Sequence, residues 1–330
     1  MSQFTNYPNG ITSFGAPVMG GSIPFVFGYA GVGNYYFVDP TNGSNDNAGT
    51  SPRFAFATVE KANAVAISGD TIVMSTNTGH AVATGLLVAT SRVNFVGADF
   101  GSRYVQQGSR IELSGAVDSA YALKVTGTRD SFSNIKIIQS STHANALTVY
   151  QAGGEGTMMN SCSVVFGVAN NLGSTSAYEV VMGEDSGSYS NCYFGTDVLL
   201  TSAARTVMLL KKVTGGSSAD GAKSNVFVDC KYKIMSSDAN ATCIKLNSTS
   251  DAKFLNEWTR PRFTAVINQT NSAVVITNAI ASASGFVEGT LAFYQPATFN
   301  FTNGCASVTD KVVVTASVAS SNSWEGVTAA

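Results

Sequence analysis

Short apolar runs separated by polar turns recur along most of this chain, and from about residue 120 onward two kinds of run alternate. Runs of the first kind hold four mostly apolar residues, and their starting points lie 24 to 36 residues apart. A single unit that recurs with such a period predicts a solenoid. Because the unit contains strands and turns but no helix, the pattern favours a parallel β-helix over helical or leucine-rich repeats. The first kind lies at 122–125, 146–149, 179–182, 207–210, 243–246 and 274–277, and the second at 132–137, 159–164, 189–194, 227–232 and 254–259.

Runs of the second kind can be aligned on a small polar residue that divides each run into two short strands. Asparagine and aspartate tolerate the left-handed backbone conformation that a sharp bend requires. We therefore expect a corner of the coil at this residue in every repeat. The aligned positions are Asn134, Ser161, Asn191, Asp229 and Asn256.

Three cysteines directly follow these predicted corners, at Cys162, Cys192 and Cys230. Equivalent positions in successive coils of a parallel sheet lie about 4.8 Å apart. The alignment therefore predicts a buried structural ladder of reduced cysteines that fills a narrow interior. Soft metals need a tetrahedral cluster of ligands, which a linear stack does not provide, so no metal site is expected.

The segment 35–74 differs from the repeats and has the character of a cap. A short apolar strand at 36–38 is followed by a polar loop, a helix-like stretch at 56–66 and a second strand at 71–74. One face of the helix is apolar except for Asn63. Because so short a helix is not stable alone, it must pack on something, and we expect it to cap the open end of the coil stack.

Residues 1–34 contain no charged side chain and show neither helical nor alternating periodicity. We interpret them as an extended arm that binds a partner protein, with an irregular flap folded on its own domain as the alternative. The predicted domains are the arm (1–34), the β-helix (35–284) and terminal coils or a small β-module (285–330). The partner-binding residues expected in the arm are Phe4, Tyr7, Pro8, Ile11, Phe14, Phe25 and Phe27.

Composition agrees with an all-β protein whose surface is largely neutral. Only 12% of the 330 residues are charged, about half of the usual ~25%, and the net charge is −2. No basic patch favours nucleic acid, and no apolar run is long enough to span a bilayer. The N-terminus lacks a secretory signal pattern, so we expect synthesis in the cytoplasm. The five cysteines lack metal-site spacing, and no cofactor motif is present.

Candidate catalytic residues are few. His80 and His143 lie in turn-like segments, and no nucleophile-elbow pattern accompanies them. Glu179, Asp197 and Asp229 could line one face of the coil, but no acid recurs at one position in consecutive repeats. We therefore predict a protein that is not an enzyme, with a hydrolase or lyase as the alternative.

Four segments carry a resemblance to a known family: YPNGITSFG (7–15), YFVDPTNGSNDNAGTSPRFAFATVEKA (36–62), GDTIVM (69–74) and TGHA (78–81). The chain resembles tailed-bacteriophage virion proteins that carry a pectin-lyase-like right-handed parallel β-helix. The resemblance implies a capsid decoration or cement protein, made in the host cytoplasm, anchored to the phage capsid by its arm and assembled as a homotrimer. The alternatives are a tail spike or fibre that binds or cleaves host surface polysaccharide, and a cellular polysaccharide enzyme.

Overall fold

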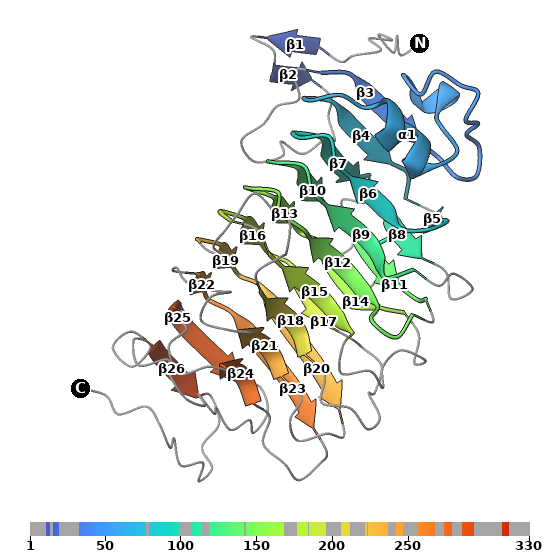
Figure 1. The fold of residues 1–330 in the computed structure, drawn as a ribbon. Helices are drawn as coiled ribbons and strands as arrows, with labels where there is room; N and C mark the ends of the chain where they lie inside the picture. Colours follow the sequence, from blue (N-terminus) through green and yellow to red (C-terminus); the bar gives the residue numbers. More distant parts are fainter. Residues whose placement is uncertain are drawn as a thin grey trace.

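The computed structural model of the protein is a stack of coils in which successive turns of the chain build three parallel β-sheets (Figure 1). This architecture confirms the predicted right-handed parallel β-helix with a short N-terminal capping helix. The structure describes residues 11–13, 16–19, 33–76, 79–98, 107–113, 119–141, 143–167, 177–183, 185–195, 206–211, 222, 224–236, 242–246, 256–267, 274–278, 286–293 and 312–316.

Each coil contributes one short strand to each sheet, and the strands pair in parallel with those of the coils before and after. The first sheet contains β3 (Tyr35–Val38), β4 (Thr71–Met74), β7 (Asn94–Gly97), β10 (Ser131–Ser133), β13 (Met158–Asn160), β16 (Ser188–Ser190), β19 (Val226–Val228) and β22 (Glu257–Thr259). The second contains β5 (Gly79–Val82), β8 (Arg110–Leu113), β11 (Lys136–Gln139), β14 (Ser163–Phe166), β17 (Tyr193–Gly195), β20 (Lys231–Ser236) and β23 (Arg262–Ile267). The third contains β6 (Leu86–Val88), β9 (Tyr121–Val125), β12 (Leu147–Gln151), β15 (Tyr178–Met182), β18 (Thr206–Leu210), β21 (Thr242–Leu246) and β24 (Val274–Asn278).

The ends of the chain add four further strands. Strand β25 (Phe286–Phe293) pairs with both β22 and β23, and β26 (Val312–Ala316) pairs with β25 in parallel. Within residues 1–34, β1 (Ile11–Ser13) and β2 (Ala16–Met19) form a separate antiparallel pair.

The interior is filled by side chains that stack from coil to coil. In the first sheet, the middle inward position is almost continuously aromatic. The rings of Phe95 and Phe132 lie 5.0 Å apart, and Phe227 stacks between Tyr189 at 4.8 Å and Trp258 at 5.0 Å. This parallel stacking is a direct consequence of the fixed register between strands of neighbouring coils.

The corner between the first and second sheets is a single residue in the left-handed conformation. Asn134, Ser161, Asn191 and Asp229 have φ between 52° and 56°, as the sequence alignment requires. The fifth predicted corner, Asn256, is wrong, because Arg260 takes that position with a φ of 48°. The main-chain N–H of Asp229 donates to the carbonyl of Thr259, which fixes this pairing between coils.

A second left-handed corner precedes the strands β7, β10, β13, β16 and β19 of the first sheet. It is formed by Arg92, Arg129, Gly156, Ser186 and Ser224, whose φ values lie between 54° and 71°. Each of the last four lies five residues before the corner described above. In the last four of these coils the strand of the first sheet is therefore framed by two sharp bends, which explains why it is only three residues long.

The residue after this second corner is often a buried Asp or Asn whose side chain binds the preceding coil. The Oδ1 atom of Asp130 accepts the N–H of Val93 at 2.9 Å, and that of Asn225 accepts the N–H of Gly187 at 2.8 Å. Asp70 and Asn256 make the same kind of bond, at 2.7 Å and 3.2 Å. Asn256 therefore belongs to this polar position, which holds successive coils together from inside.

The helix α1 (Val59–Val65) follows the 3-10 turn η1 (Pro52–Phe54) and packs beside the first coil. The Thr58 hydroxyl caps its first turn by accepting the N–H of Lys61. Asn63, the polar exception on its apolar face, donates to the carbonyl of Leu87 at 2.8 Å, and Glu60 accepts the N–H of Ala83. The helix therefore satisfies main-chain groups at β6, the edge strand of the third sheet.

Candidate functional site

The predicted partner-binding residues of the arm are mostly outside the described part of the structure. Ile11 lies in β1 and pairs with Met19 of β2. Phe4, Tyr7, Pro8, Phe14, Phe25 and Phe27 all lie outside the described residues. Their binding role stays a prediction.

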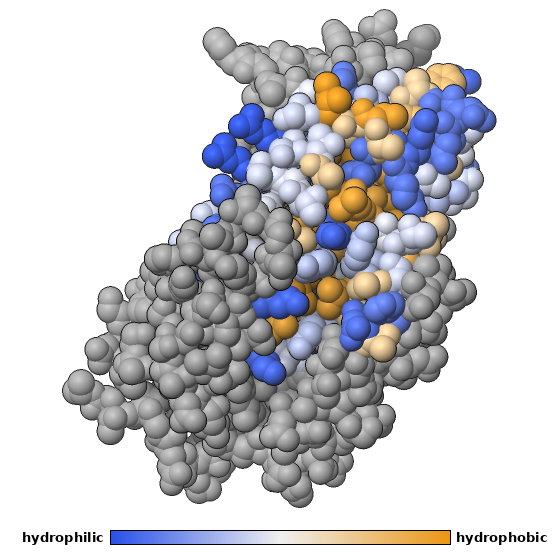
Figure 2. Space-filling view, in the orientation of Figure 1, coloured by the Kyte–Doolittle hydropathy of each residue, from blue (hydrophilic) through white to orange (hydrophobic). Residues whose placement is uncertain are grey.

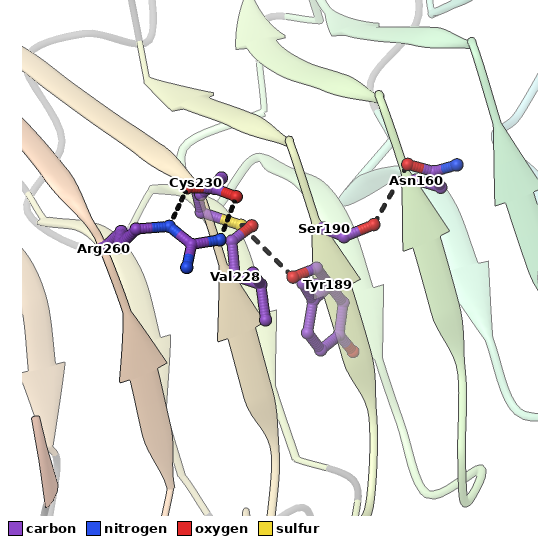
Figure 3. Close-up of polar contacts among 7 residues, drawn as sticks. Asn160, Tyr189, Ser190, Val228, Cys230 and Arg260 are labelled. Carbon is purple, nitrogen blue, oxygen red and sulfur yellow. Dashed lines mark hydrogen bonds and ion pairs between the residues drawn. The ribbon is translucent and has the colours of Figure 1, made fainter. Parts of the chain in front are cut away.

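The structure places Cys162, Cys192 and Cys230 at one position on three successive coils, each with 1% exposure or less. Each thiol donates to a carbonyl of the preceding coil, at 3.3 Å to Phe132, 3.4 Å to Met159 and 3.5 Å to Tyr189. Figure 3 shows the last of these bonds, from Cys230 to Tyr189. Burial raises the pKa of Cys162 and Cys192 well above the usual range. The thiolate, which is the reactive form, is therefore strongly disfavoured.

The acids considered from the sequence do not gather into one site. Glu179 is buried in β15 with 1% exposure, whereas Asp229 lies at an exposed corner, where Arg260 binds it with two hydrogen bonds at 2.6 and 2.8 Å (Figure 3). Asp197 lies outside the described residues. Among the residues that the structure describes, no three His, Cys, Asp or Glu side chains are close enough to hold a metal ion.

The two histidines have structural environments. His80 is buried in β5, where its Nε2 lies 3.1 Å from the carbonyl of Ser75, and burial lowers its pKa. His143 lies in a turn, where its Nδ1 accepts the N–H of Asn145. The Ser141 hydroxyl accepts the main-chain N–H of His143 at 3.4 Å, but among the hydrogen bonds of the described residues neither imidazole ring pairs with a serine hydroxyl or a cysteine thiol.

The outer face of the third sheet carries three partly exposed tyrosines and a lysine on neighbouring strands. We call it the tyrosine patch, and it comprises Leu87, Tyr121, Lys124, Leu147, Tyr150 and Tyr178. The register places Tyr121, Leu147 and Tyr178 in one row across β9, β12 and β15, and Leu87, Lys124 and Tyr150 in a second row across β6, β9 and β12. Figure 2 shows this face as a mixture of hydrophobic and hydrophilic side chains.

Lys124 lies between two rings of the tyrosine patch. Its Nζ is 5.7 Å from the ring centre of Tyr121 and 5.4 Å from that of Tyr150, within the range of cation–π attraction. Burial raises the pKa of Tyr150 and Tyr178, so both phenols are neutral hydrogen-bond donors at physiological pH. Leu87 is 44% exposed and extends the apolar surface.

Such an arrangement can hold a ligand that presents both flat apolar faces and hydroxyl groups. Aromatic faces accept C–H surfaces, while the phenols and the ammonium group supply hydrogen bonds. The strand sequences YALK, LTVY and YEVV contain the signal, since a half-exposed tyrosine stands at one end of each. It was missed because these runs were interpreted only as buried strands.

Comparison with known proteins shows the fold. No protein-family model matches the chain, and no curated protein matches its sequence. Among solved structures, it is similar to a GH136 lacto-N-biosidase from Eubacterium ramulus (TM-score 0.53, 10% identity, covering 81% of this chain and 57% of that one). Carrot pectin methylesterase (TM-score 0.49, 12% identity, 87% of this chain and 89% of that one) and pectate lyase Pel9A (TM-score 0.42, 14% identity, 90% and 81%) are also similar.

These structures correct the prediction that the chain is not an enzyme. The similar solved structures are mostly enzymes, and the names of several refer to action on carbohydrates. Since the identities lie between 9% and 14%, the similarity shows the parallel β-helix and transfers no active-site residue.

Proposed function

We propose that this chain is a polysaccharide-binding β-helix that holds a sugar chain against the tyrosine patch. The observation that carries the proposal is the position of Tyr121, Tyr150 and Tyr178 on three adjacent coils, with Lys124 between two of the rings. Adjacent coils are about 4.8 Å apart, so successive rings can contact successive parts of one extended polymer.

The chemistry of the patch suits a sugar better than a protein partner. Specific, stable protein interfaces use roughly 20–30 residues from each partner. The tyrosine patch instead combines a few rings with hydroxyl and ammonium donors. A pyranose offers the complementary groups, with apolar C–H faces and a rim of hydroxyl groups that can donate and accept hydrogen bonds.

We place this protein in a phage particle, as a spike or fibre component that would meet host surface polysaccharide. The support is the resemblance carried by residues 7–15, 36–62, 69–74 and 78–81. Assembly as a homotrimer would present three patches to one polymer, so that weak individual contacts combine into a higher avidity.

Substitution of the three rings tests the proposal. In Tyr121→Ala, Tyr150→Ala and Tyr178→Ala, we expect binding to a panel of capsular and O-antigen polysaccharides to weaken by up to about tenfold for each ring, and to be lost in the triple variant. The Tyr→Phe variants should retain most of the affinity, because the ring remains. Calorimetry or an affinity gel measures the binding, and assays for new reducing or unsaturated ends in the same mixtures measure cleavage.

Phe54→Ala is the matched control, since it removes a ring that is 54% exposed on η1, outside the third sheet. It should leave polysaccharide binding unchanged. Equal affinity of the wild type and the triple tyrosine variant for every bound polysaccharide would contradict the proposal.

A second candidate function is capsid decoration or cementing through residues 1–34. The observation that favours it is the absence of charge in a segment with several aromatic side chains, which suits docking along another protein's surface. We expect deletion of residues 1–30 to abolish binding to phage particles while leaving a folded, β-rich protein. Cosedimentation with particles and circular dichroism measure the two properties, and full particle binding by the truncated protein would exclude this role.

A further inference from the structure

Two arginines occupy the left-handed corner before the first sheet in adjacent coils. Arg92 and Arg129 are paired by the register, because the N–H of Arg92 donates to the carbonyl of Thr128. Their φ values are 62° and 59°, and both side chains are exposed. Each arginine lies four residues beyond β6 or β9, strands that contribute to the tyrosine patch.

Two arginines at these positions lower the stability of the folded protein. A left-handed conformation costs a residue with a Cβ atom roughly 1 kcal/mol or more, and the next three coils use Gly156, Ser186 and Ser224 at this corner. Like charges on neighbouring strands also repel each other. Residues that lie in an unfavourable backbone conformation and repel each other are candidates for a functional role.

Neither arginine has a carboxylate counter-ion in the part of the chain that the structure describes. Glu155 is adjacent, but it contributes its main-chain carbonyl to the N–H of Arg129 and no ion pair. Asp130 is fully buried and accepts the N–H of Val93. A guanidinium beside its carboxylate would lower the pKa of Asp130, whereas burial raises that pKa to about 7.

We infer that Arg92 and Arg129 together form a binding site for a tetrahedral oxyanion, a phosphate or sulfate monoester. A guanidinium fork binds two oxygens of an oxyanion, and the spacing of about 4.8 Å between coils lets two forks approach one group from adjacent positions. A carboxylate satisfies one fork with its two oxygens. A phosphate or sulfate ester has three non-bridging oxygens and can satisfy two.

The inference deepens the proposed function, and it rests on that function only for the identity of the polymer. A phosphorylated or sulfated sugar chain lying on the tyrosine patch would place its charged substituent at the corner that follows β6 and β9. The oxyanion site itself depends on Arg92 and Arg129 alone.

The test uses the full chain with inorganic phosphate and inorganic sulfate as probes, at constant ionic strength maintained with chloride. Isothermal titration calorimetry compares the wild type with the double variant Arg92→Gly/Arg129→Gly. Glycine suits the left-handed corner, as Gly156 shows, so the double variant should unfold at a higher temperature than the wild type. We expect it to bind either anion at least about tenfold more weakly.

Arg53→Ala is the control for loss of a positive charge elsewhere on the surface, because Arg53 is an exposed arginine on η1. It should bind the anions as the wild type does. An affinity of the double variant within about twofold of the wild type would overturn the inference, and so would an equal loss in Arg53→Ala, which would indicate general charge attraction.

A second experiment distinguishes binding of the free anion from binding of its sugar ester. It also distinguishes failure of this inference from failure of the proposed function. Phosphorylated oligosaccharides should bind more tightly than the same oligosaccharides after phosphatase treatment, and the difference should vanish in the double arginine variant. Loss of phosphate binding in that variant, together with no effect of the tyrosine substitutions on oligosaccharides, would leave the oxyanion site standing and overturn the proposed function. Preference for the dephosphorylated form would overturn the ester assignment.

Discussion

Replacing Asp130 with asparagine should raise the free energy of unfolding at pH 8 by about 2–3 kcal/mol. Burial raises the pKa of Asp130 from 3.8 to about 7, so folding must remove a charge from water above that pH. A difference of about three units between the folded and unfolded pKa corresponds to roughly 4 kcal/mol. The amide group that replaces the carboxylate is an unpaired buried donor, which costs about 1–2 kcal/mol and leaves a net gain of about 2–3 kcal/mol.

The sign of this effect fixes its pH dependence. Because the folded pKa is the higher one, the wild type should lose stability as the pH rises from about 4 to about 7, and the loss should then level off. The Asp130→Asn variant should lack this decline. Urea unfolding at a series of pH values measures both curves, and parallel curves would contradict the assignment.

Asp70→Asn is the matched control, since Asp70 occupies the same position in an earlier coil. Both of its oxygens accept main-chain N–H groups, from Asn34 at 2.7 Å and from Ile67 at 2.8 Å. An amide would turn a donor toward one of these N–H groups, at a cost of about 1–3 kcal/mol. The same substitution should therefore destabilise the protein at one corner and stabilise it at the other.

The second large effect is expected from Phe227→Ala in the aromatic stack of the first sheet. Phe227 is 1% exposed and lies between the rings of Tyr189 and Trp258. Its removal should leave a void between two parallel rings and lower the free energy of unfolding by about 3–5 kcal/mol. Denaturant unfolding followed by tryptophan fluorescence measures the loss, with Trp258 as a direct neighbour.

Phe54→Ala serves again as the control for ring removal. Since Phe54 is 54% exposed, its loss should change the free energy of unfolding by no more than about 0.5 kcal/mol. Phe227→Leu, which fills part of the void, should fall between the two. A loss below 1 kcal/mol for Phe227→Ala would mean that the stack can close up without it.

The corner residues show what the sequence could predict and why it failed at one point. Asn134, Ser161, Asn191 and Asp229 were found because small polar residues mark a left-handed bend. Arg260 carries no such mark, so the alignment moved to Asn256, the nearest asparagine. Asn256 has the right chemistry for a corner, but its side chain serves the buried polar position instead.

The other corner could not be found from residue type. Arg92, Arg129, Gly156, Ser186 and Ser224 share a backbone conformation and little else. The last four share a fixed distance of five residues to the later corner, and that distance can be recognised only once the strand between the two corners is known to be three residues long.

The tyrosine patch was hidden for a different reason. Hydrophobic periodicity identifies which residues belong to a strand, but it assigns a half-buried tyrosine to the core as if it were fully buried. Which side of the strand faces solvent depends on the closure of the coil. The rows formed by Tyr121, Tyr150 and Tyr178 therefore emerge only from the register between coils.

The contacts of α1 with the first coil cover the N-terminal end of the stack. A bare terminal coil would offer its main-chain groups to the last coil of another molecule, and such copies could join head to tail into a filament. Asn63 and Glu60 occupy groups at Leu87 and Ala83 that this addition would use. Addition of another molecule to this end of the stack would therefore require displacement of the helix.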